Sequence, residues 1–166
     1  MTGSRRAGAA PPFPRGFTSA SVAAGIKAGG APDLSLLRCD GGAAAAAMFT
    51  TNAFAAAPIL ASRRNLRDSR GHCRALIVNS GCANAATGPQ GVADAEAMID
   101  AVAVACGCTP AAVLVNSTGV IGHRLPIDRV TAAIPGLARA CETGSCEPFE
   151  RGIMNTDTQP KMRTRT

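Results

Sequence analysis

A hydrophobic run that ends in small polar residues and a glycine is the part of this sequence best suited to chemistry. Residues 112–115 read Ala-Val-Leu-Val, and Asn116, Ser117, Thr118 and Gly119 follow. A strand ending in such a turn exposes backbone N–H groups that no neighbouring strand uses, and glycine lets a substrate oxygen approach the backbone closely. Fixed donors of this kind stabilise the negative oxygen of a tetrahedral intermediate in acyl transfer. Most turns of this composition are only turns, so the motif alone leaves a structural role open.

A second polar cluster lies near the C-terminus. Residues 154–161 read Met-Asn-Thr-Asp-Thr-Gln-Pro-Lys, directly after an expected short helix. Four adjacent short polar side chains could hydrogen-bond the ammonium and carboxylate of an amino acid. Clusters of Ser, Thr, Asn and Asp more often cap helices and form turns, so both interpretations stand on the residues alone.

The sequence lacks the residues that other common chemistries need. No nucleophile elbow, phosphate loop or dinucleotide fingerprint is found in its proper context. The seven cysteines are odd in number and include no C-x-x-C pair, and His72 and His123 are far apart in the sequence. We therefore expect no metal site and no cofactor, and we interpret the cysteines as reduced thiols of a cytoplasmic protein.

Composition and charge favour one globular domain that binds neither nucleic acid nor membranes. The net charge of +6 is concentrated at the two ends of the chain, and the arginines at positions 63, 64, 67 and 70 have no aromatic residue among them for base stacking. No apolar run approaches the ~18–20 residues of a membrane span. Residues 1–14 lack a hydrophobic signal core and contain several prolines, which predicts a disordered tail.

Hydrophobic periodicity predicts alternating strands and helices. Expected extended segments are 34–37, 48–52, 57–60, 75–78 and 112–115, the third because Pro58 disfavours helix at its predecessor. Expected helices are 91–107, one beginning at Pro126 that Pro135 ends or kinks, and 147–154. Alternation of this kind predicts a layered α/β architecture.

Five segments in order resemble the bifunctional ornithine/glutamate N-acetyltransferase family of arginine biosynthesis. The resemblance runs from Arg15 to Lys161. Its segments are Gly16-Phe17 with Val22-Ala23-Ala24-Gly25-Ile26-Lys27, Met48-Phe49-Thr50-Thr51-Asn52, Val78-Asn79-Ser80-Gly81-Cys82-Ala83-Asn84-Ala85, Ser117-Thr118-Gly119-Val120-Ile121-Gly122, and Ile153-Met154-Asn155-Thr156-Asp157-Thr158-Gln159-Pro160-Lys161.

The resemblance implies a fold and a mechanism. The fold would be the layered sandwich of sheets and helices shared with N-terminal-nucleophile-like aminopeptidases. A precursor would cut itself before an internal threonine, which becomes the nucleophile of a β segment. That threonine would carry acetyl from N-acetylornithine, or from acetyl-CoA in bifunctional members, to glutamate. Thr118 and Gly119 would form the oxyanion hole, Asn155 and Thr156 would contact the substrate, and an α2β2 assembly is implied.

The sequence departs from the family at several places. Asn155 stands where the family usually has Thr, and Cys82 stands where it usually has Asn. After Lys161, residues 162–166 do not match, so residues 15–161 correspond to an incomplete α segment without the threonine nucleophile. Alone, such a chain is expected to be inactive. The alternatives are an inert fragment or an interaction subunit that pairs with a β-segment partner, and an aminopeptidase of the same architecture.

Overall fold

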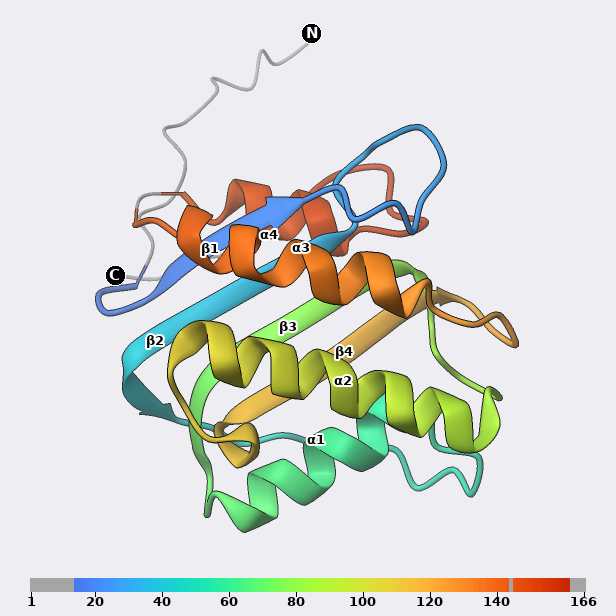
Figure 1. Ribbon diagram of the computed structural model, residues 1–166, viewed down its shortest axis with the longest axis horizontal. Coiled ribbons are helices and arrows are strands. Elements are labelled where there is room, and N and C mark those ends of the chain that lie inside the picture. Colours follow the sequence, from blue (N-terminus) through green and yellow to red (C-terminus); the bar gives the residue numbers. More distant parts are fainter. Residues whose placement is uncertain (1–13, 144, 162–166) are drawn as a thin grey trace, which may run out of the picture.

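The computed structural model describes residues 14–143 and 145–161, so most of the expected N-terminal tail and residues 162–166 lie outside the described part. Its centre is a four-stranded sheet with the order β1-β2-β3-β4 (Figure 1). Neighbouring strands are antiparallel except β3 and β4, which are parallel. The strands are β1 (Thr18–Val22), β2 (Leu34–Ala44), β3 (His72–Cys82) and β4 (Val113–Val120).

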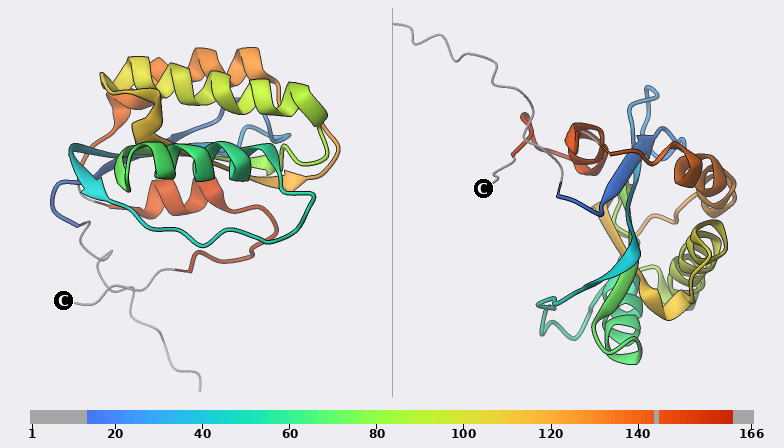
Figure 2. Two further views of the ribbon diagram at one scale, coloured as in Figure 1. Left: turned by 90° about the horizontal axis from the view of Figure 1, so that it is seen from below. Right: turned by 90° about the vertical axis from the view of Figure 1, so that its left-hand side faces the viewer.

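Helices lie on both sides of the sheet, which confirms the expected layered α/β architecture. The helices α2 (Gly88–Cys106) and α3 (Ile127–Ala140) cover one face, and α4 (Glu147–Ile153) lies on the opposite face (Figures 1 and 2). The helix α1 (Ala57–Asp68) runs along the outer edge of β4, and a short 3-10 turn, η1 (Pro110–Ala112), precedes that strand. On the α4 side, the helix packs mainly on β1 and β2, so much of the β4 face is left without a helix.

The core lies between the sheet and the helices α2 and α3. Leu36, Ile77 and Val115 are neighbours across three strands and are almost completely buried. Side chains alternate between the two faces of a strand, so these residues share one face and meet the buried side of the helices, including Ile99 and Ile134. Burial of this apolar layer supplies the main stabilisation of the fold.

Several expected elements are confirmed. The runs 75–78 and 112–115 lie in β3 and β4, and the expected helix 91–107 corresponds to α2. Gly107 follows α2 in the left-handed conformation with φ 61°, which glycine adopts without steric cost. The last expected helix, 147–154, corresponds to α4.

The structure corrects two expectations about prolines, the first wholly and the second in part. The segment 57–60 is helical, because Pro58 occupies the first turn of α1, where a backbone N–H would have no helical partner. The helix α3 continues through Pro135 rather than ending there. Val130, Ile134 and Leu137 are fully buried on both sides of that proline, and their packing outweighs the lost hydrogen bond.

Two further expectations need correction. Residues 48–52 are extended, but they belong to no sheet, because no strand in the described residues pairs with them. Val92, expected on the buried face of its helix, is 37% exposed, because α2 begins at Gly88 and buries Gly91, Asp94 and Ala95 instead. No helix in residues 14–143 and 145–161 is long and apolar enough to cross a bilayer.

We expect Ile99→Ala to lower the free energy of unfolding by about 2–5 kcal/mol, because it leaves a cavity at a fully buried position of α2. Val104→Ala on the same helix is the control, since Val104 is 84% exposed and its truncation should change stability by less than ~0.5 kcal/mol. Denaturant unfolding of both variants measures the difference. Equal losses would contradict the assignment of the core.

Candidate functional site

Thr118 and Gly119 lie at the carboxyl end of β4. Both are half-buried, and Val120, which follows them, is 54% exposed. Because β3 and β4 are parallel, Ser80 and Gly81 of β3 lie directly beside them in the sheet. The carboxyl ends of parallel strands are the usual place for ligand sites in α/β sheets.

The N–H of Gly119 points away from β3. Val115 bonds through both its N–H and its C=O to the hydroxyl of Ser62 in α1, at 2.9 and 2.6 Å, so its backbone groups face the outer edge of the sheet. Every second residue of a paired strand bonds to the same side, so Ser117 and Gly119 also face outward. The carbonyl of Val120 fits this alternation, because it accepts a bond from Ala83, which follows β3.

The outward N–H groups of Ser117 and Gly119 differ in whether they have a hydrogen-bond partner. The N–H of Ser117 donates to the Asn116 side chain at 3.0 Å. The helix α1 does not extend along β4 beyond Ser117, so the N–H of Gly119 lies at the edge of the sheet. This is the donor that the sequence motif predicted for an oxyanion.

Gly119 cannot be replaced by a larger residue without moving the sheet. Its φ is 137°, which side chains rarely tolerate. A Cβ atom there would lie 2.2 Å from the carbonyl carbon of Gly81 and 2.4 Å from the nitrogen of Cys82. The glycine therefore allows the two strand backbones to approach closely at the point where the donor is exposed.

The Thr118 side chain lies on the sheet face that carries α4. Val113 and Val115 are buried under α2, and alternation puts Thr118 on the other face. Its neighbour Ser80 donates its hydroxyl to the carbonyl of Gly152, at the end of α4, at 2.6 Å. The strand that pairs with Thr118 thus also anchors the segment that leads to Asn155.

Asn155 and Thr156 follow α4 and are exposed. Among the described residues, no hydrogen bond involves their side chains. The preceding residue, Met154, is fixed by its carbonyl, which accepts a bond from the Lys27 ammonium at 2.5 Å. The structure thus brings the 155–158 segment to the same end of the sheet as Thr118 and Gly119, through contacts of its neighbours rather than of its own side chains.

Asp33, and a role for Lys27 in the site, were not predicted from the sequence motifs. Asp33 is fully buried, and its carboxylate accepts bonds from the N–H groups of Ala24, Ile26 and Lys27 at 2.6, 2.6 and 2.8 Å. Those bonds shape the loop that carries Lys27 toward Met154. Burial lowers the pKa of Lys27, and the nearby Asp33 charge opposes that shift. One sequence signal was available, because Lys27 is one of only two lysines in an arginine-rich chain.

The stem of Lys27 also lies against the oxyanion turn. A Cβ atom on Gly81 would come within 3.0 Å of the Lys27 side chain and 3.1 Å of the Ile26 side chain. Gly81 is the direct partner of Gly119 in the sheet. Lys27 therefore lies between the candidate oxyanion donors and the candidate substrate segment.

Four of the seven thiols are poor candidates for a nucleophile. Burial raises the pKa of Cys73, Cys106 and Cys108, and raises that of Cys141 to about 11, so these thiols are protonated at neutral pH. Within residues 14–143 and 145–161, no group of three or more His, Cys, Asp or Glu side chains could hold a metal ion.

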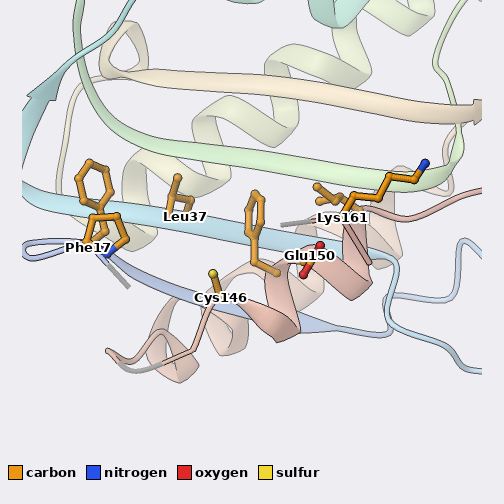
Figure 3. Close-up of a pocket in the computed structure, with 8 residues that line it drawn as sticks. Phe17, Leu37, Cys146, Glu150 and Lys161 are labelled. Atoms are coloured by element: carbon orange, nitrogen blue, oxygen red, sulfur yellow. The ribbon is translucent and has the colours of Figure 1, made fainter. Parts of the chain in front are cut away.

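A hollow of about 310 Å³ lies beside α4 on the face that carries Thr118 (Figure 3). Its lining is mainly apolar, with Phe17, Leu37 and Cys146 on one side and Glu150 and Lys161 on the other (Figure 3). None of the predicted site residues lines it. It marks apolar surface on the sheet face opposite α2 and α3.

Gly119→Ala should destabilise the chain by about 2–4 kcal/mol, because the new methyl group meets the β3 backbone and the backbone angle is unfavourable. Gly136→Ala is the matched control, since a Cβ atom there would meet only the flexible end of Arg139, at 4.0 Å, and a helical alanine is favoured. Thermal and denaturant unfolding compare the two variants. Similar stabilities would show that the strands are not held together at Gly119.

Comparison with known proteins supports the resemblance. The model of the ArgJ family matches residues 18–166. The Arginine biosynthesis bifunctional protein ArgJ of Nitratidesulfovibrio vulgaris is 45% identical over 152 residues, which make up 92% of this chain but 38% of the relative. The chain thus spans less than two fifths of the length of that curated relative.

Two crystal structures have the same fold. One is the Arginine biosynthesis bifunctional protein argJ of Bacillus halodurans, with TM-score 0.78 and 34% identity over 87% of this chain and 75% of that chain. The other is the ornithine acetyltransferase of Mycobacterium tuberculosis complexed with ornithine, with TM-score 0.84 and 42% identity over 91% of this chain and 81% of that chain. On its sequence and its fold, this chain belongs to the ArgJ family.

Proposed function

We propose that this chain is the N-terminal part of an acetyltransferase of arginine biosynthesis and supplies its oxyanion hole. The observation that carries the proposal is the outward N–H of Gly119 at the exposed end of β4. The Thr118 hydroxyl is the second donor. Two fixed donors beside a carbonyl oxygen stabilise the charge that develops there during acyl transfer.

The proposed reaction moves an acetyl group in two steps. The hydroxyl of an N-terminal threonine attacks the acetyl carbonyl of N-acetylornithine, and its own α-amino group takes the proton. The same group passes that proton to the departing nitrogen, so ornithine leaves with a free amine and the acetyl group stays on the threonine as an ester. The amine of glutamate then attacks the acetyl ester, which releases the threonine hydroxyl and forms N-acetylglutamate. Acetyl-CoA would replace N-acetylornithine as donor in a bifunctional enzyme, and no cofactor is needed. Thr118 and Gly119 bind the oxyanion in both steps.

We place the nucleophilic threonine in the part of the family that this chain does not span. The lengths of the relatives support a second polypeptide. This chain covers 38% of the curated Nitratidesulfovibrio protein but 75% and 81% of the two crystallised chains. The crystallised chains are therefore about half as long as the curated relative, as expected if the family functions as two polypeptides.

The substrate amino acid would lie between Thr118 and the segment after α4. Asn155 and Thr156 offer exposed amide and hydroxyl groups there, and Lys27 holds the segment in place through Met154. The Mycobacterium protein was crystallised with ornithine, an amino acid of the proposed size and charge. An α2β2 assembly in the cytoplasm completes the proposal, without nucleic-acid or membrane partners.

An interaction subunit without turnover is the second candidate, because the chain spans less than two fifths of its curated relative. The two functions differ in what happens when the missing part is supplied. An acetyltransferase component gains turnover, whereas an interaction subunit binds without producing any.

We expect the 166-residue chain alone to give no acetyl transfer from N-acetylornithine to glutamate. Mixed with the C-terminal part of the Nitratidesulfovibrio relative, expressed to begin at its threonine nucleophile, it should give measurable turnover. In that mixture Thr118→Val should lower kcat about 10²–10³-fold, because one oxyanion donor is lost. Thr131→Val is the control, since the Thr131 hydroxyl bonds within α3.

Turnover by the chain alone would overturn the placement of the nucleophile. An equal kcat for Thr118→Val and the unsubstituted chain would overturn the oxyanion assignment. Association of the two polypeptides without turnover would favour the interaction subunit.

A further inference from the structure

An extended segment between β2 and α1, residues 45–56, stands away from the rest of the fold and is here called the arm. It lies on the same side of the sheet as α4 in both views of Figure 2. Its Met48 side chain is fully exposed, and Phe54 is 91% exposed. Two large apolar side chains of one segment are thus in contact with solvent, and burying them would favour association with a partner.

The arm keeps an extended shape without a strand beside it. At its start, the N–H of Ala45 donates to the carbonyl of Gly71 at 2.7 Å. In its middle, Arg63 of α1 donates to the carbonyl of Thr50 at 2.8 Å and stacks over the ring of Phe49, 5.4 Å from its centroid. Between these anchors, the N–H groups of residues 46–51 have no hydrogen-bond partner among the described residues.

The arm also lacks the features that normally protect an exposed strand. No charged residue occurs from Gly41 to Ser62. Natural proteins usually place lysine, other charges or a bulge on a strand edge to prevent pairing. An apolar hollow of about 480 Å³ continues the surface at the end of the arm, with Phe54, Leu60, Thr87 and Val92 in its lining.

We propose that the arm is a docking strand, along which a β-strand of the second polypeptide pairs with residues 46–51. This inference rests on the proposed function, and it assigns the surface that the partner uses. Strand addition pairs every second one of these N–H groups, those on the edge that faces the partner, with the partner's carbonyls, and the exposed side chains supply apolar contact. Phe54 and the hollow beside it receive apolar side chains at the end of the added strand.

Two observations favour this occupant. About three fifths of the length of the curated relative lies outside the matched segment, which is more than enough for a further sheet. The sheet face between α4 and the arm carries half-buried Leu76 and Leu114 and has no helix over β4. A second layer placed there reaches the arm and Thr118 together. The arm contains no charged residue that could bind a nucleic acid or an acidic peptide.

The test compares Ala47→Pro and Met48→Pro with Ala47→Ser and Met48→Gln in binding to the C-terminal part of the Nitratidesulfovibrio relative. Both positions are exposed, and the N–H groups of adjacent extended residues face opposite edges, so one of the two prolines removes an N–H on the partner's edge. Serine and glutamine keep the N–H, and each is close in size to the side chain it replaces. Calorimetry should show affinity about tenfold or more weaker for one of the proline variants, and within a few-fold of the unsubstituted chain for Ala47→Ser and Met48→Gln. The unfolding midpoint of each isolated chain should stay unchanged.

Equal affinity of both proline variants and the unsubstituted chain would overturn the docking strand while the proposed function stands. Failure of the unsubstituted chain to bind would overturn both. If light scattering instead shows a dimer of this chain that a proline variant dissociates, the occupant is a second copy, and the assignment of the partner is wrong.

Discussion

The close approach of the β3 and β4 backbones at Gly81 and Gly119 determines the geometry of the candidate site. A side chain on Gly119 would enter the backbone of β3, so the two strands can stay paired up to their carboxyl ends only with glycine there. The same register directs the Gly119 N–H out of the ladder. Gly119 thus meets a steric requirement of the sheet and also supplies the oxyanion donor.

A buried carboxylate connects that turn to the segment expected to bind substrate. Asp33 is withdrawn from water, which is tolerated because three N–H groups bond to it. These bonds fix the loop of Lys27, whose stem lies on Gly81 and whose ammonium reaches the Met154 carbonyl. A change of the Asp33 side chain would therefore affect both parts of the site, although the carboxylate bonds only to the loop that carries Lys27.

The sequence predicted the parts of the fold that depend on local pattern. Buried runs at 75–78 and 112–115 and the periodic helix ending at Gly107 needed only the spacing of apolar residues. The expected effect of proline was wrong at Pro58, which fits the first turn of α1. At Pro135 the helix does not end, because the residues around that proline are buried. The role of Lys27 could not be read from the sequence, because its partner Met154 is distant in the chain and is contacted through a carbonyl. For the arm, the sequence predicted an extended segment at 48–52 but not its separation from the sheet.

Amide hydrogen exchange at Thr118, Gly119 and Val120 shows whether the Gly119 N–H is a free donor. The alternation of β4 gives the N–H groups of Thr118 and Val120 to β3 and directs that of Gly119 outward. In the folded chain Gly119 should exchange many-fold faster than its two neighbours. Equal protection of all three amides would show that the Gly119 N–H is already bonded, and Gly119 would then have no donor to offer an oxyanion.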